Sequence, residues 1–293
     1  MYQLSGIGWQ EVWISRPRTP WFYIIWALLY SQLIFVELAI YGRLWHVRLR
    51  DLWPVLFRKK VLNTDIVSYA GEAYFFLWAQ KRVPHPTRQI LGTIKDNAIA
   101  SMLGSWSAAL LLLGGFLYGG QITLLDIIGE TTPFYIIGAV PLAAIGLSLL
   151  ARFRRTIFTL PTRTVLGLIG IHLGRFMLII YVLQIVQWWI VVPEASLKVW
   201  ATMLVILTIV NRLPLVPAKD ILGAAAVLGI SSLLDASQPV IAALLMTQLA
   251  LNKSANLFLF AGTSIGDRIR NRRSKTAVDP GSRPPDPKTI QAN

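Results

Sequence analysis

Residues 21–42 read WFYIIWALLYSQLIFVELAIYG, a long and mostly apolar run that contains one charged residue, Glu37. A helix needs roughly 20 such residues to cross about 30 Å of hydrocarbon at about 1.5 Å per residue. Trp21, Tyr23 and Tyr41 lie near the two ends of the run, where aromatic side chains settle at the boundary between lipid and water. The stretch therefore predicts a transmembrane helix.

The composition of the whole chain supports the same class of protein. Of its 293 residues, 55% are hydrophobic and only 14% are charged, whereas a soluble domain has about 25% charged residues. So few charges do not cover a soluble surface. The chain has no cysteine and three histidines, which excludes disulfide scaffolds, thiolate nucleophiles and cysteine-ligated metal centres. We therefore expect an integral membrane protein without a metal or other cofactor.

The distribution of charge predicts how the chain is oriented. Lysine and arginine outnumber the acidic residues by 28 to 14. Most of them fall in four segments beside the apolar runs, residues 43–60, 81–95, 152–163 and 268–288. The connections 119–133 and 193–198 hold almost none. This alternation is typical of a multi-spanning protein with its basic loops in the cytoplasm, so we expect a cytoplasmic C-terminus and no nucleic-acid partner.

The remaining apolar runs predict an all-α, polytopic membrane helical bundle. Further full-length spans are expected at residues 97–118, 134–151, 164–192 and 238–262. Three runs are short for a span: residues 66–79, expected to be an interfacial or re-entrant helix, and residues 199–210 and 221–234, expected to cross as partners. The total is about six spans plus re-entrant or broken helices. The expected organisation is an N-terminal interfacial segment over 1–20, a transmembrane domain over 21–266 and a disordered basic cytoplasmic tail over 267–293.

Acidic residues inside apolar runs are the first candidate site. Glu72 lies seven residues after Asp65, and residues at this spacing share a face of a helix. Both carboxylates are then expected to look into one cavity, where they balance charge or relay protons. The alternative is an interfacial acid bonded to the basic loop. Glu37 is expected to snorkel or to pair with Arg43.

His172 and Arg175 lie three residues apart near the middle of the 164–192 run, hence on one face of its helix. An arginine at that depth is costly and needs a partner. One reading is a structural pair with a carboxylate. The other is contact with an anionic substrate, because the guanidinium grips phosphate with two parallel hydrogen bonds.

Arg212, Lys219 and Asp220 flank Pro214 and Pro217. Two prolines so close together break a helix, and a discontinuous helix at mid-membrane is a common way to build a transport site. A helix that begins near Lys219 would also offer free N–H groups to an anion. The alternative is a turn outside the membrane with solvated charges.

Gln248, Asn252 and Asn256 recur every four residues along the last span, with Lys253 beside them. They form one polar stripe on an otherwise apolar helix. Such a stripe either joins helices by hydrogen bonds or lines a polar path, and both interpretations agree with the sequence.

Two stretches resemble the transmembrane region of the lysylphosphatidylglycerol synthetase family, the flippase-like domain of lipid transporters. The first contains Arg43-Leu44-Trp45, Asn63, Gly71-Glu72-Ala73-Tyr74 and Lys81-Arg82. The second runs from Arg212-Leu213-Pro214 through Pro217 and Gly223 to Asn256. The resemblance implies helices broken by a re-entrant segment and a role in lipid movement.

We therefore expect a flippase-like protein that moves or handles a polar-headed or anionic lipid between leaflets of a bacterial inner (cytoplasmic) membrane. Membrane lipids are the expected partners, and other membrane proteins are a second expected class. Arg175, Arg212 and Lys219 would contact the head group. The alternative is a non-transporting subunit or assembly factor of a larger membrane complex. The sequence holds no P-loop, G-x-S-x-G or H-E-x-x-H motif, so nothing in it supports an enzyme.

Overall fold

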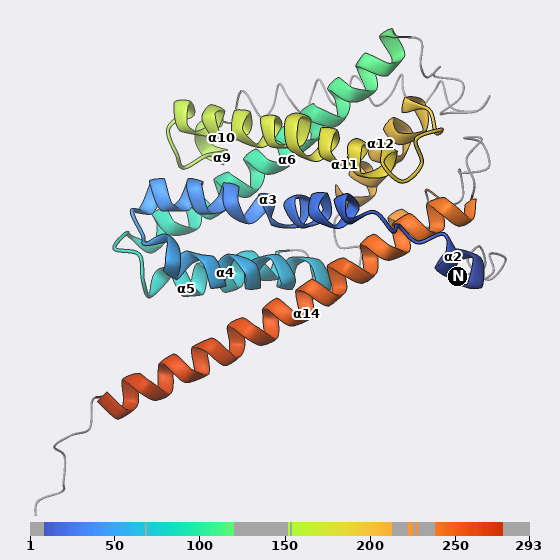
Figure 1. Cartoon of the computed structure of the whole chain (residues 1–293). Helices are drawn as coiled ribbons and strands as arrows, with labels where there is room; N and C mark the ends of the chain where they lie inside the picture. The colour runs from blue at the N-terminus through green and yellow to red at the C-terminus, as the bar shows by residue number, and fades with distance from the viewer. Residues whose placement is uncertain are drawn as a thin grey trace, which may run out of the picture.

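The computed structural model describes residues 9–67, 69–119, 152, 154–212, 222–224, 227 and 238–277. Every regular element in those ranges is a helix, which confirms the predicted all-α class (Figure 1). The elements are α2 (Trp9–Ile14), α3 (Pro20–Trp45), α4 (Leu49–Val61), η1 (Leu62–Ile66), α5 (Ala70–Gln80), α6 (Thr87–Tyr118), α9 (Arg154–Ile157), α10 (Thr162–Gly174), η2 (Arg175–Tyr181), α11 (Val182–Trp189), α12 (Leu197–Arg212) and α14 (Gln238–Ala277).

Two of the described helices are long and apolar enough to cross a membrane, Pro20–Trp45 and Thr162–Trp189. They agree with the runs predicted at 21–42 and 164–192. The second is α10, η2 and α11 in one continuous rod, with a π-helical stretch in the middle. The two rods lie side by side with opposite chain directions (Figure 1). At one end the Gln187 amide donates to the Phe22 carbonyl oxygen over 2.9 Å.

The other predicted spans are only partly visible. Residues 97–118 fall within α6, residues 199–210 within α12 and residues 238–262 within α14. Within α12, Val199–Thr208 is a shorter apolar helix. Residues 134–151 and most of 221–234 lie outside the described part of the chain. The number of spans therefore stays a prediction.

The basic helix α4 turns back into α5, and the two pack side by side. After η1 the backbone is extended at Val67 and left-handed at Tyr69, with a φ of 73°, so the helix predicted over 66–79 begins at Ala70. Gly71 makes this close return possible: its N–H donates to Asn63 Oδ1 over 2.7 Å. A Cβ atom at Gly71 would lie 2.0 Å from the Lys59 carbonyl oxygen.

Helix α6 packs along α10. The two helices approach closely at Gly104, where an added Cβ would lie 2.8 Å from the His172 Cβ. Below it, buried Asp96 accepts hydrogen bonds from the backbone N–H groups of Thr159 and Leu160, over 2.8 and 2.7 Å. Asp96 thus ties the segment that enters α10 to α6.

Helix α14 runs diagonally across the bundle, and its C-terminal end projects beyond the other helices (Figure 1). The disordered tail predicted from residue 267 is wrong as far as Ala277, because the helix continues through this basic stretch. Arginine and lysine are good helix formers and stabilise the negative C-terminal end of a helix. Residues 278–293 lie outside the described part of the chain, as do residues 1–8 of the predicted interfacial segment.

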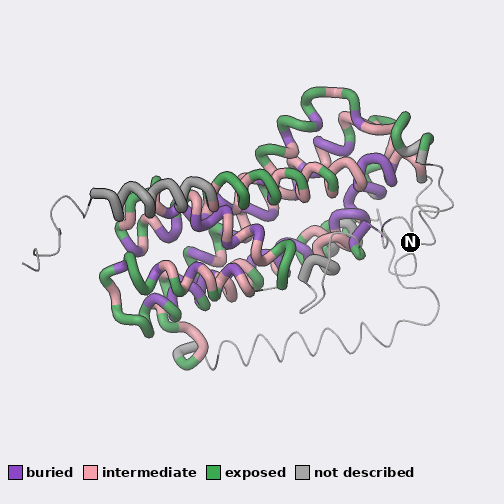
Figure 2. Tube along the Cα trace, turned by 90° about the horizontal axis from the view of Figure 1, so that it is seen from below, coloured by how far each residue is buried: buried purple, intermediate pink, exposed green. Residues whose placement is uncertain are grey.

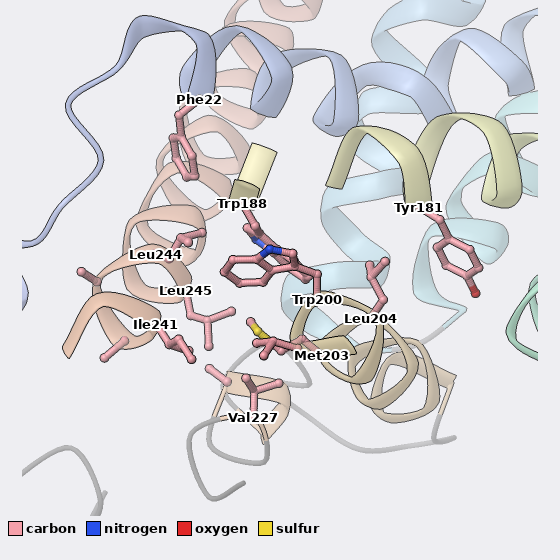
Figure 3. Close-up of a cluster of buried hydrophobic side chains, with 14 of the residues drawn as sticks. Phe22, Tyr181, Trp188, Trp200, Met203, Leu204, Val227, Ile241, Leu244 and Leu245 are labelled. Carbon is pink, nitrogen blue, oxygen red and sulfur yellow. The ribbon is translucent and has the colours of Figure 1, made fainter. Parts of the chain in front are cut away.

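Two apolar clusters hold the helices together. One joins α11, α12 and α14 around Trp188 and Trp200, whose rings lie 5.7 Å apart (Figure 3). The other joins α3, α4 and α5 around Tyr41, Trp45 and Phe75. Buried residues lie on the inner sides of the helices and exposed ones on the outer sides (Figure 2). Many of the exposed residues are large and apolar.

Candidate functional site

A buried ion cluster lies at the centre of the α3–α4–α5 packing. The Lys59 ammonium donates to the Glu37 carboxylate and lies 3.7 Å from Glu72 Oε1. The Lys59 and Glu37 side chains are 5% and 9% exposed, and that of Glu72 is 20% exposed. The proposed pairing of Glu37 with Arg43 is therefore wrong: a lysine from the next helix holds it. One ammonium here faces two carboxylates.

A chain of polar contacts continues from this cluster across the bundle. The Lys59 ammonium lies 5.5 Å from the centre of the Tyr41 ring. The Asn97 amide nitrogen on α6 donates to the Tyr41 hydroxyl over 3.1 Å. The Asn97 carbonyl oxygen lies 3.0 Å from Nε2 of His172, which is fully buried. Because Asn97 offers an acceptor there, His172 donates through Nε2.

Arg175 and Gln32 meet at the midpoints of the two span-length helices. Gln32 Oε1 accepts from the Arg175 guanidinium over 3.1 Å. Arg175 also lies 3.5 Å from the Ser101 hydroxyl and stacks on Phe176. Since Asn97 and Ser101 are one turn apart on α6, His172 and Arg175 do share a face, as predicted. Arg175 is buried, 5% exposed.

Two adjoining cavities lie between α3, the α10–α11 rod and α14, and we call them together the amide cavity. Their volumes are about 250 and 450 Å³. They share six lining residues, Leu33, Thr64, Ile180, Gln184, Gln248 and Asn252. The smaller part adds Trp26, Leu29, Tyr30, Gln32, Lys60 and Asn256. The larger part reaches Phe176, Leu204, Leu207 and Leu245, and both parts are lined mainly by apolar surface.

The polar stripe of α14 joins helices by hydrogen bonds, which is one of its two predicted roles. Gln248 exchanges hydrogen bonds with Gln184, over 3.1 and 3.5 Å. Asn252 Oδ1 accepts from the Trp26 indole over 2.9 Å, and Asn256 Oδ1 accepts from the Tyr30 hydroxyl. These bonds join α14 to α3 and α11. The same three amides line the amide cavity.

Asp65 and Glu72 do not share a cavity, so the prediction of one helical face is wrong. The extended and left-handed residues between η1 and α5 reset the helical register. Asp65 pairs with Lys253 and accepts from the Asn256 amide over 2.8 Å. Glu72 instead lines a separate groove of about 410 Å³ between α5 and α6, whose other walls are almost all apolar.

The site predicted around Pro214 and Pro217 lies mostly outside the described residues. Arg212 is the last residue of α12. Lys219 and Asp220 lie outside the described residues. The structure therefore brings together Gln248, Asn252 and Asn256 in one cavity, with Arg175 one hydrogen bond behind its wall through Gln32.

Several residues of the cavity and of the ion cluster were not predicted. Gln32 and Gln184 could have been noticed, since Gln32 is the one amide in its apolar run and Gln184 forms a pair with Gln187 in another. Lys59 and Lys60 could not, because they sit in a basic stretch that reads as a cytoplasmic loop. Their burial depends on partners far along the chain. Lys60 donates to the Tyr30 carbonyl oxygen and lies 3.1 Å from the centre of the Tyr30 ring.

Comparison of the chain with family models, with curated proteins and with solved structures gives no match.

Proposed function

We propose that this chain is a polytopic membrane protein that holds the polar head group of a lipid in the amide cavity and moves the lipid between leaflets. The observation that carries the proposal is the cavity itself. It places five side-chain amides, Gln32, Gln184, Gln248, Asn252 and Asn256, between helices of span length.

The position of the cavity along the helices supports a transport role. Gln32, in its wall, is at the midpoint of α3. Polar groups are expensive at that depth of a bilayer, and they mark substrate pathways when they face an internal space. If the amides served only to join the helices, no open volume between them would be needed. The cavity's 250 and 450 Å³ fall in the range of binding sites for small ligands.

The cavity combines side-chain amides with apolar walls, as the two ends of a lipid require. The amides suit a head group that exchanges hydrogen bonds. The larger part is walled by Phe176, Leu204, Leu207 and Leu245, which suits the start of an acyl chain. Exposed apolar side chains on the outer sides of the helices face the bilayer in this arrangement.

The same proposal includes about six spans, a re-entrant α4–α5 pair, an inner-membrane location and a cytoplasmic C-terminus. The basic residues along the end of α14 support this orientation. The resemblance to flippase-like lipid transporters agrees with it.

Filling the cavity should stop transport. Leu33 lines both halves of the cavity and Phe35, two residues further along α3, is 54% exposed. We expect Leu33→Trp to lower the rate of lipid translocation by tenfold or more, since an indole occupies the head-group space, and Phe35→Trp to leave it unchanged. The measurement is movement of fluorescent lipids between leaflets of reconstituted vesicles.

Equal rates in both tryptophan variants would contradict the proposal. If the protein moves no lipid and copurifies in mild detergent with a stoichiometric partner, it would instead be a membrane subunit or assembly factor. Thermal unfolding of both variants shows whether a lost rate reflects lost folding.

A further inference from the structure

The walls of the amide cavity carry more hydrogen-bond donors than the protein itself uses. Gln32 Oε1 accepts from Arg175 and Asn252 Oδ1 accepts from Trp26. The two side-chain nitrogens, Gln32 Nε2 and Asn252 Nδ2, have no hydrogen-bond partner among the described residues. Each presents two N–H groups. Thr64 donates to the Lys60 carbonyl oxygen over 2.9 Å, so its hydroxyl oxygen still has lone pairs to accept a bond.

The charge of the cavity wall is low and positive. Lys60 is the one charged residue among those described that line the smaller part, and the Tyr30 carbonyl oxygen and ring hold its ammonium. Asp65, whose carboxylate bonds the cavity residue Asn256, is also paired with Lys253. In the described wall, no carboxylate is available to an amine.

An aromatic pair completes the wall. Trp26 and Tyr30 both line the smaller part, and their rings lie 5.4 Å apart at 36°. Tyr30 is buried and the Lys60 ammonium lies over its ring, so the ring surface left for the apolar face of a ligand is that of half-buried Trp26. Amides at the edges and aromatic surface on one side fit a ring or chain that carries several hydroxyl groups.

We propose that the amide cavity selects lipids with a hydroxyl-rich head group, a sugar or a polyol, over lipids with an amine head group. This inference rests on the proposed function and names its substrate class. Hydroxyls both donate and accept, so they complement amides in any orientation. An ammonium group would be desolvated without a counter-charge among donors that point at it, which is costly.

The binding test uses the purified protein in mild detergent with four lipids of identical acyl chains. These are phosphatidylinositol, glucosyl diacylglycerol, phosphatidic acid and phosphatidylethanolamine, and native mass spectrometry reports which lipid stays bound. We expect both hydroxyl-bearing lipids to be retained about tenfold more than phosphatidylethanolamine. Phosphatidic acid retained as well as phosphatidylinositol would show that Lys60 recognises phosphate alone and would overturn the inference.

The variant Asn252→Asp is expected to reverse the preference between the two classes of head group. The aspartate keeps an oxygen for the Trp26 indole and places a carboxylate where the free amide nitrogen was. We expect it to invert the preference toward phosphatidylethanolamine, whereas Gln89→Glu, the same charge change at an exposed position of α6, keeps the wild-type order. A variant Asn252→Asp that folds normally and retains the wild-type order would overturn the inference.

The two proposals fail in different ways. Translocation of phosphatidylethanolamine as fast as of phosphatidylinositol would leave transport intact and remove the selectivity. Selective retention of glucosyl diacylglycerol by a protein that moves no lipid would keep the selectivity and remove transport.

Discussion

Replacing Lys59 with methionine is expected to destabilise the folded protein by about 3–5 kcal/mol, the usual cost of removing one partner from a buried ion pair. Lys59 and Glu37 are both buried, and Glu72 lies 3.7 Å from the same ammonium. Without Lys59, two carboxylates remain in a low-dielectric interior with their counter-charge gone. The loss would appear in detergent-induced unfolding of the purified protein in mixed micelles.

Two further variants separate charge from packing. Lys81→Met removes a lysine at an exposed position after α5 and should change the free energy of unfolding by less than about 0.5 kcal/mol. The double change Lys59→Met with Glu37→Leu replaces the pair by apolar side chains of similar size, which is often neutral. We expect it to recover more than half of the loss. A double variant less stable than Lys59→Met would contradict a role for the unpaired charge.

Gly71→Ala is expected to destabilise the α4–α5 pair by about 1–3 kcal/mol or more, the range found for overpacked sites. The new Cβ would lie 2.0 Å from the Lys59 carbonyl oxygen and 2.7 Å from Asn63 Oδ1. A backbone carbonyl cannot rotate away, so the two helices must separate. Because Glu72 follows Gly71, the separation also draws its carboxylate away from Lys59.

A glycine elsewhere provides the matched control. Gly170 lies in α10, and a Cβ there meets no atom within 4 Å. Alanine is the better helix former by about 1 kcal/mol, so Gly170→Ala should raise the unfolding midpoint slightly while Gly71→Ala lowers it. Thermal unfolding in detergent compares the two. A rise for both would show that α4 and α5 do not approach as closely as the structure has them.

The helices themselves followed from hydropathy, because burial in apolar surroundings acts on each segment separately. The runs at 21–42 and 164–192 became α3 and the α10–α11 rod with ends displaced by three residues or fewer. Local signals also predicted that His172 and Arg175 share a face. Length alone did not decide whether residues 66–79 enter the membrane. The first residue of the helix in this segment, Ala70, depended on the close contact of Gly71 with Asn63.

The side-chain partnerships could not be predicted, because they join residues far apart in sequence. Trp26 reaches Asn252, and Arg58 reaches Thr263, across more than 200 residues. The failed pairing of Asp65 with Glu72 has a local cause: periodicity assumes one unbroken helix, and the left-handed Tyr69 breaks it. The polar stripe of α14 was visible in the sequence, whereas the cavity that it lines required the positions of α3 and α11.

The most direct test of the account is whether water reaches the amide cavity within the membrane. The chain has no cysteine, so a thiol reagent labels only the single cysteine that is introduced. Leu33→Cys faces the cavity and Phe35→Cys faces outward, about 3 Å apart along the axis of α3. With a charged thiol reagent applied to reconstituted vesicles, we expect position 33 to be labelled and position 35 to stay unlabelled. Labelling of neither residue, or of position 35 alone, would contradict a polar lipid path between α3, the α10–α11 rod and α14.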